Sequence, residues 1–210
     1  GDTKVVPRGC GDGIYINTAG VGEMIEGVDI APANIKAGMD IIVSGTIGDH
    51  AATVMAARHN LTLPPEIMSD SAPLCHMTAA MLASAPFIAV LRDPTRGGVA
   101  ASLNELAQAA KVGILLEEGA IPVHPAVQGV CDLLGFDPLT LANEGKLLAF
   151  VSPEDTARVL DVMHADPHGR AACVIGHTTA EAPGEVGLRT ALGGIRVVDL
   201  PLGELVPRIC

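Results

Sequence analysis

Short apolar segments alternate with amphipathic ones along most of this chain, and that alternation limits the folds open to it. The apolar runs predict buried strands, whereas the segments between them have helical spacing. The clearest helix carries Val99, Leu103 and Leu106 on one face. Such a chain is expected to be α+β, with mixed α/β layers around a core. The expected strands are 39–44, 87–91, 113–116, 147–151, 172–175 and 195–198, and the expected helices are 49–60, 71–85, 97–111, 124–134 and one that starts after a cap at Ser152.

The chain is expected to divide into three parts. Residues 1–37 hold two short predicted strands around a Gly-Asp-Gly turn, followed by a glycine-rich stretch, and we interpret them as the end of an N-terminal domain and a linker. Residues 38–200 form the predicted α/β sandwich domain. Residues 201–210, with two prolines and a glycine, are expected to form a flexible tail that ends at Cys210.

Composition argues against several classes of partner. The 210 residues include 13 basic and 24 acidic ones, and the resulting net charge of −11 disfavours a nucleic acid or an anionic membrane surface as partner. Aromatic residues make up 2% of the chain and Trp is absent, which disfavours stacking on bases. The five cysteines are odd in number and form no C-x-x-C pair, a pattern typical of a reduced, cytoplasmic protein.

The segment 93–98, Asp-Pro-Thr-Arg-Gly-Gly, lies between a predicted strand and the clearest predicted helix. Its glycines would let backbone N–H groups approach an anion, and the start of a helix adds partial positive charge. Arg96 could clamp a phosphate through two hydrogen bonds, and Asp93 could hold Mg²⁺ or accept a proton. An ordinary turn that caps a helix fits the same pattern, because Asp and Thr are common there.

Two further segments could carry chemistry. Lys4 enters a predicted strand and could reach a phosphate, with Asp2 as a metal ligand, although the residues alone favour a polar edge residue and a solvated lysine. Glu144, in an Asn-Glu-Gly-Lys segment before a strand, could act as a general base or lie in a plain surface turn. The turn at 45–50 lacks the Gly-Lys-Ser/Thr of a phosphate-binding P-loop, so Asp49 is expected to cap a helix there.

The last residue, Cys210, follows Pro-Arg-Ile. A sulfur on a terminal segment could carry an attached group from one site to another, and Arg208 would favour the reactive thiolate. A free thiol on a frayed terminus is the alternative that the tail alone leaves open.

Four motifs follow one another along the chain: Gly-Asp-Thr-Lys-Val-Val at 1–6, Asp-Gly-Ile-Tyr-Ile-Asn-Thr at 12–18, Asp-Pro-Thr-Arg-Gly-Gly-Val at 93–99 and Asn-Glu-Gly-Lys at 143–146. With this order and the terminal cysteine, the chain resembles the HypE family of hydrogenase maturation factors, the carbamoyl dehydratases. The resemblance covers essentially the whole chain, within the wider superfamily of aminoimidazole ribonucleotide synthetase and selenophosphate synthetase. Chains of that family begin well before Gly-Asp-Thr-Lys. The missing part is therefore expected to hold most of an ATP-binding domain, including its early acidic Mg²⁺ ligands.

The resemblance implies an ATP-dependent dehydration of a thiocarbamate on Cys210 to a thiocyanate, which supplies the cyanide ligand for the iron of nickel–iron hydrogenase. It implies ATP and Mg²⁺ as cofactors, a HypF-like carbamoyltransferase and a HypC–HypD-like iron scaffold as partners, a homodimer, and a cytoplasmic location. The implied catalytic residues are Cys210 as the carrier, Glu144 as the base and Lys4 as its helper. The implied nucleotide ligands are Asp2, Lys4, Asp93, Thr95, Arg96, Gly97 and Gly98, with Asp2 also holding the metal.

Two alternatives remain. The chain could be another ATP-dependent synthetase of the superfamily, similar to selenophosphate synthetase, but those enzymes carry their reactive Cys or selenocysteine near the N-terminus, whereas this chain ends in Pro-Arg-Ile-Cys. It could also be a non-catalytic fragment that binds partner proteins without ATP, and nucleotide binding would separate that possibility from the enzyme.

Overall fold

The computed structural model describes residues 8, 9, 13, 19–85 and 87–200. The predicted strands before residue 19 and the predicted tail at 201–210 fall outside this part of the chain, together with Asp2, Lys4 and Cys210. The predicted divisions at residues 37 and 200 stay predictions.

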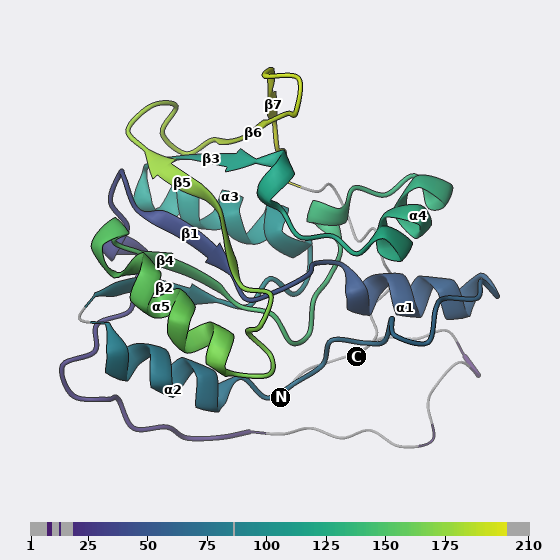
Figure 1. Ribbon diagram of the computed structural model, residues 1–210, viewed down its shortest axis with the longest axis horizontal. Helices are drawn as coiled ribbons and strands as arrows, with labels where there is room; N and C mark the ends of the chain where they lie inside the picture. Colours follow the sequence, from purple (N-terminus) through teal and green to yellow (C-terminus); the bar gives the residue numbers. More distant parts are fainter. Residues whose placement is uncertain (1–7, 10–12, 14–18, 86, 201–210) are drawn as a thin grey trace.

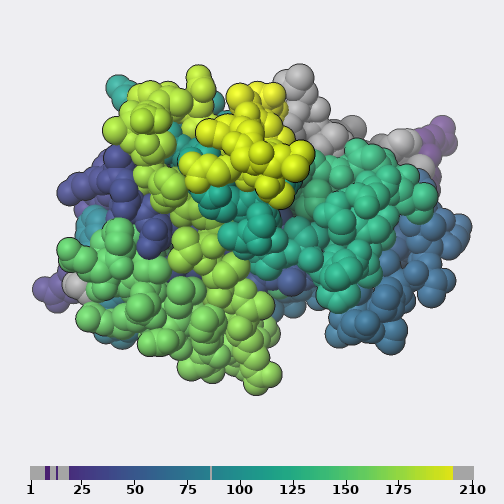
Figure 2. Space-filling model, turned by 45° about the horizontal axis from the view of Figure 1, so that its top comes forward, coloured from purple at the N-terminus to yellow at the C-terminus, as the bar shows by residue number. Residues whose placement is uncertain are grey.

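One mixed seven-stranded sheet organises the described residues, with the strand order β2-β4-β1-β5-β3-β6-β7. Neighbouring strands are antiparallel except β3 and β6, which run parallel. Strand β7 at the edge has three exposed residues, and Figure 2 shows this part of the chain, in yellow, on the outside of the molecule. The strands are β1 (Asp40–Val43), β2 (Ile88–Arg92), β3 (Gly113–Glu117), β4 (Leu148–Val151), β5 (Cys173–Thr179), β6 (Val186–Arg189) and β7 (Ile195–Val197).

Helices cover both faces of this sheet (Figure 1). Because successive side chains of a strand point to opposite faces, Ile41 and Phe150 pack in one apolar cluster with α3, whereas Ile42 and Ala149 pack in another with α2 and α5. Helices α1 and α4 contact each other at one end of the sheet and share a third apolar cluster. The helices are α1 (Asp49–Arg58), α2 (Cys75–Ser84), α3 (Gly98–Ala110), α4 (Pro125–Leu134) and α5 (Pro153–Ala165), with short 3₁₀ helices η1 (Pro32–Asn34), η2 (Glu118–Ala120) and η3 (Pro138–Thr140).

The structure confirms the predicted α+β class with mixed layers, and several local predictions differ from it. Strand β5 extends to Thr179, four residues beyond the predicted end. Strand β6 was not predicted, because only Val186 and Leu188 of its four residues are apolar and buried. Helix α2 begins at Cys75, so the residues 71–74 that were predicted as its first turn are irregular. Ser152 precedes α5 as predicted, but its side chain makes no capping hydrogen bond to a backbone N–H.

Candidate functional site

The register of three strands brings two of the predicted functional segments together. Leu148, at the start of β4, pairs with Val43 at the end of β1 on one side and with Arg92 at the end of β2 on the other. Because both pairings are antiparallel, the loops that leave β1 and β2 lie beside the segment that enters β4. The turn at 45–48, the loop at 93–97 and the segment 143–147 therefore meet at one edge of the sheet.

Asn143 joins these three segments with hydrogen bonds. Its side chain is 1% exposed, and its Oδ1 accepts from the backbone N–H of Gly48 at 2.8 Å. Its Nδ2 donates to the carbonyl oxygens of Pro94 and Leu141 at 3.0 Å, and its own backbone N–H donates to Pro94 at 3.2 Å. A buried amide with these partners fixes the loop at 93–97 against the start of α1. The sequence motif contained Asn143, but sequence reasoning assigned it no role.

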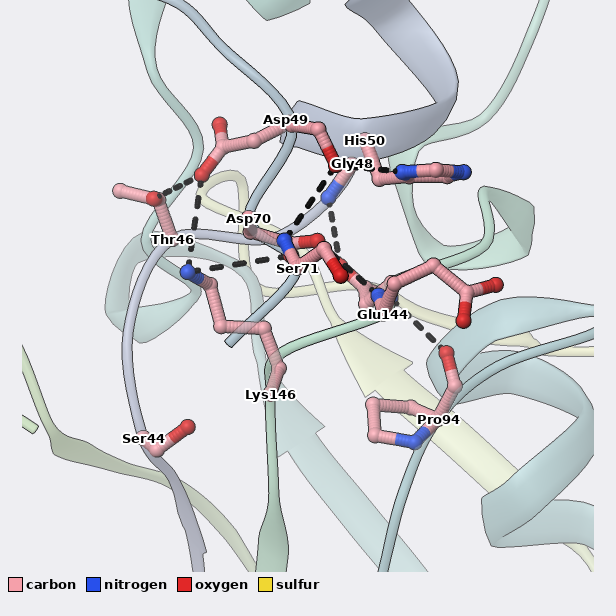
Figure 3. Close-up of polar contacts among 12 residues, drawn as sticks. Ser44, Thr46, Gly48, Asp49, His50, Asp70, Ser71, Pro94, Glu144 and Lys146 are labelled. Atoms are coloured by element: carbon pink, nitrogen blue, oxygen red, sulfur yellow. Dashed lines mark hydrogen bonds and ion pairs between the residues drawn. The ribbon is translucent and has the colours of Figure 1, made fainter. Parts of the chain in front are cut away.

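Lys146 and Asp70 form the polar centre of the site. The ammonium Nζ of Lys146 lies 3.7 Å from Asp70 Oδ2 and 3.8 Å from Asp49 Oδ2, and Figure 3 shows it between the two carboxylates. The other oxygen of Asp70, Oδ1, accepts a hydrogen bond from the backbone N–H of Glu144 at 2.9 Å. The carboxylate of Glu144 is exposed and points away from Lys146 (Figure 3). The segment predicted to carry a base is therefore held by its backbone and leaves its carboxylate in solvent.

The predicted role of Asp49 as a helix cap is wrong. The N-cap of α1 is Gly48, whose φ of 82° lies in the left-handed region, and Asp49 is the first helical residue. Its Oδ2 accepts a hydrogen bond from the hydroxyl of Thr46 and faces Lys146. The carboxylate therefore helps to hold the charged lysine.

Buried polar atoms without hydrogen-bond partners gather at this centre. Within the described part of the chain they are Asp49 Oδ1, His50 Nε2 and Asp70 Oδ2. The other ring nitrogen of His50, Nδ1, lies 2.8 Å from the hydroxyl of Ser69. An unsatisfied buried polar group costs about 1–3 kcal/mol, and such groups in folded proteins are often found at functional sites. A cavity of about 300 Å³ opens beside Lys146 and is lined also by Ser44 and Arg170.

The loop at 93–98 only partly fits the predicted phosphate cradle. Gly98 donates its N–H to the carbonyl of Thr95 at 3.0 Å, and a Cβ on it would lie 2.5 Å from the carbonyl oxygens of Leu139 and Leu141. Gly98 therefore serves close packing beneath η3. Asp93 and Arg96 are exposed, and neither side chain has a hydrogen bond or ion pair with another described residue.

Gly97 caps the N-terminus of α3 with a φ of 72°, where the helix dipole attracts an anion. Asp93, Thr95, Arg96 and Gly97 thus remain predicted ligands near the start of α3, because Asp93 and Arg96 are exposed and Thr95 and Gly97 are partly exposed.

Asp70 is the site residue that sequence reasoning missed. It lies in an irregular segment, 67–74, whose residues follow neither helical nor strand spacing. Its carboxylate accepts a hydrogen bond from the backbone N–H of Glu144, which lies 74 positions later in the sequence. The one available signal was the polar run Ser-Asp-Ser between apolar residues, which is common in surface loops.

Two cysteines in the described residues are poorly suited to nucleophilic chemistry. Burial, with Asp132 and Asp137 nearby, raises the pKa of the Cys131 thiol to about 11. Burial also raises the pKa of the half-buried Cys173, whose sulfur faces the carbonyl of Ala120. A raised pKa keeps a thiol protonated and weakens it as a nucleophile. Cys75 is exposed.

The helices of the described residues are all too short or too polar to cross a membrane.

Comparisons with known proteins agree with the predicted resemblance to HypE. Over 210 residues the chain is 50% identical to the carbamoyl dehydratase HypE of Rhodobacter capsulatus and 49% identical, over 211 residues, to that of Bradyrhizobium diazoefficiens. These alignments cover 100% of this chain and 62% and 61% of the relatives. The chain therefore spans about three fifths of the length of the curated relatives that it matches.

Solved structures of HypE have the same fold. A crystal structure of hydrogenase maturation protein HypE matches 86% of this chain and 58% of its own, with a TM-score of 0.83 and 38% identity. HypE in complex with ATP matches 86% of this chain and 55% of its own, with a TM-score of 0.81 and 37% identity. A HypE–HypF complex matches 84% and 57%, with a TM-score of 0.79 and 39% identity.

Residues 36–189 also match a known domain family. These residues match the AIR synthase related protein, C-terminal domain, and they include β1 to β6 and the five α-helices of the described residues. The match confirms the predicted superfamily. The chain belongs to the AIR synthase related protein family, and residues 36–189 form its C-terminal domain.

Proposed function

We propose that this chain is the larger part of an ATP-dependent carbamoyl dehydratase that matures nickel–iron hydrogenase. The observation that carries the proposal is the identity of 50% over the whole chain with a carbamoyl dehydratase HypE. The structure adds support, because the register of β1, β2 and β4 joins the segments that hold the predicted base and the predicted phosphate ligands.

The proposed reaction starts from a thiocarbamate on Cys210. ATP, when bound, would supply the phosphoryl group that turns the amide oxygen into a leaving group, with ADP released as the bond to the transferred phosphorus breaks. Phosphate would then depart with that oxygen as the C–O bond breaks. The nitrogen would lose one proton to the base and the other to solvent, and the C–N bond would become the triple bond of a thiocyanate. We assign the removal of a proton to Glu144, assisted by Lys4. The exposed carboxylate of Glu144 suits a base that meets a substrate arriving on a separate segment.

The nucleotide is proposed to contact the start of α3. Arg96 would bind a phosphate, Gly97 would offer its backbone at the helix N-terminus, and Asp93 and Thr95 would complete the contact. Asp2 and Lys4 are proposed as the metal and phosphate ligands that precede the described residues. We propose that further Mg²⁺ ligands lie in an N-terminal segment corresponding to the part of the relatives that this chain does not match.

The proposed partners follow from the same relatives. A HypE has been solved with HypF, and we propose a HypF-like carbamoyltransferase as the donor to Cys210. A HypC–HypD-like iron scaffold is proposed as the acceptor of cyanide, with a homodimer in the cytoplasm as the working form.

The deciding experiment replaces Glu144 by Gln in the full-length protein, because Gln keeps the shape but cannot accept the proton. We expect Glu144→Gln to accept the carbamoyl group and bind ATP, while single-turnover dehydration, read by mass spectrometry as the loss of one water, slows by about 10²–10⁴-fold. The control is Glu154→Gln, an exposed glutamate in the first turn of α5, which should dehydrate at the parent rate. A rate for Glu144→Gln within about threefold of the parent, well below the usual contribution of a base, would remove Glu144 from the mechanism.

A second measurement separates the enzyme from a fragment that only binds partner proteins. We expect the 210-residue chain alone to bind Mg-ATP weakly, because without the proposed further Mg²⁺ ligands phosphate charge is poorly neutralised, even with Asp2, Lys4 and the loop at 93–98 present. Titration calorimetry of this chain and of the full-length protein compares the two directly. Tight binding by the short chain would contradict the proposed position of the nucleotide, whereas no binding by the full-length protein would favour the fragment that only binds partners.

A further inference from the structure

The backbone of Glu144 is fixed by a residue from a distant, irregular part of the chain. Asp70 Oδ1 accepts the N–H of Glu144 at 2.9 Å, and the Asp70 side chain is only 2% exposed. A buried carboxylate that accepts a backbone N–H makes a charge-assisted hydrogen bond, which is stronger than a neutral one. Together with the hydrogen bonds of Asn143, this bond fixes the peptide that carries the proposed base.

A second contact holds the same short segment two residues after Glu144, at Lys146. Lys146 Nζ lies 3.7 Å from Asp70 Oδ2, so one carboxylate faces both Glu144 and Lys146. Asp49 Oδ2 lies 3.8 Å from the same ammonium and connects it to the start of α1. Figure 3 shows this arrangement, with Glu144 directed away from the two carboxylates.

The segment between these contacts lies directly against Asp70. A Cβ built on Gly145 would be 1.7 Å from the backbone oxygen of Asp70, so a glycine is needed for this close approach. The Asp70 segment is in turn tied to α1, because Ser69 Oγ lies 2.8 Å from His50 Nδ1. The position of Glu144 therefore depends on contacts that run from Asp49 and His50 at the start of α1 through the irregular segment that holds Asp70.

We propose that Asp70 is a positioning residue for Glu144: it holds the segment 143–146 through the N–H of Glu144 and the ammonium of Lys146. The inference rests on the proposed role of Glu144 as the base. The carboxylate of Glu144 has no hydrogen bond or ion pair to any other described residue, so its place is set by its backbone alone. A misplaced catalytic group can lose about 10²-fold in rate.

The first test is a double-mutant cycle in the full-length protein, with Asp70→Ala, Glu144→Gln and the double variant. We expect Asp70→Ala to slow single-turnover dehydration by about 10–100-fold while ATP affinity stays unchanged. In the Glu144→Gln background the same change should cost little more, because two residues that act as one unit are not additive. An equal loss in both backgrounds, or no loss in the parent, would overturn the inference.

Two further variants distinguish positioning from general damage. Asp70→Asn keeps an oxygen that can accept the N–H of Glu144, and it should recover part of the rate that Asp70→Ala loses. Asp155→Ala removes another buried carboxylate, at 6% exposure in α5, which pairs with Arg158. It should leave the rate of the folded protein unchanged. A rate for Asp70→Asn as low as that of Asp70→Ala, or an equal loss in Asp155→Ala, would contradict the inference.

The second test does not depend on the reaction. Hydrogen exchange of the Glu144 amide, followed by NMR in the 210-residue chain, should accelerate at least about tenfold in Asp70→Ala, because loss of its hydrogen bond to Asp70 opens that amide to water. Asp155→Ala should leave it unchanged. If Glu144→Gln alone dehydrates at the parent rate, the proposed base is wrong, and the exchange then decides by itself whether Asp70 holds the segment. An unchanged exchange rate of the Glu144 amide in Asp70→Ala would show that Asp70 does not hold the segment, and would overturn the inference.

Discussion

Strand β4 and the segment just before it, residues 143–146, differ in what they bury: the strand buries apolar side chains, and the segment lies in a buried polar centre. Within the strand, Leu148 to Val151 are completely buried between α3 on one face and α2 with α5 on the other. Just before the strand, Asn143, Glu144 and Lys146 belong to a polar centre whose neighbours include three buried atoms without hydrogen-bond partners. The strand contributes stability through close packing, whereas the segment before it holds a polar arrangement at a cost in stability. We infer that the cost is maintained for function, since unpaired buried polar groups are otherwise rare.

The first prediction removes the largest side chain on the apolar side of this comparison. Phe150 is 0% exposed in β4 and packs in the cluster beneath α3. Phe150→Ala should lower the free energy of unfolding by about 3–5 kcal/mol, because it removes buried apolar surface and leaves a cavity. Urea unfolding of the 210-residue chain measures this. In the full-length protein, dehydration per folded molecule should stay near the parent value, and a loss of rate in fully folded protein would show that core and site are coupled.

The second prediction introduces one methyl group on the polar side. Gly145→Ala places a Cβ against the backbone of Asp70, so the segment 143–146 must shift. We expect a loss of about 1–3 kcal/mol in the free energy of unfolding, as for other overpacked sites, together with slower dehydration. Gly129→Ala is the matched control, because Gly129 is exposed in α4 with open space around it. It should stabilise the chain by about 0.5–1 kcal/mol. Equal effects of the two substitutions would contradict the inference that the close approach to Asp70 requires a glycine at position 145.

The third prediction, which has no effect at neutral pH, concerns the thiol of Cys131 in the cluster shared by α1 and α4. The folded pKa is raised to about 11, above the usual value of about 8.5 in an unfolded chain. The protonated thiol therefore contributes stability that is fully present below about pH 8.5 and is lost as the pH rises towards 11. The difference in unfolding free energy between the parent and Cys131→Ala should shrink over that range. A constant difference would show that Cys131 ionises as freely in the folded chain as in the unfolded one.

Sequence reasoning succeeded where the signal is local. The apolar stripe of α3 and the buried runs of β1 and β4 predicted these elements because helical and strand periods are written in neighbouring residues. It missed β6, where glycine and arginine alternate with only two apolar residues. The Asn-Glu-Gly-Lys and Asp-Pro-Thr-Arg-Gly-Gly segments were also found, because each motif is made of consecutive residues.

The sequence by itself therefore determined the layered fold, the family and two polar segments with candidate chemistry. Only the tertiary structure decided that those segments meet, since the pairing of Leu148 with both Val43 and Arg92 depends on strands far apart in the chain. Only the tertiary structure brought Asp70 to Glu144, because Asp70 lies in a segment without periodicity and is placed by its contacts with α1 and Lys146. Long-range placement of this kind is set by packing and hydrogen bonds across the whole fold, which no local pattern records.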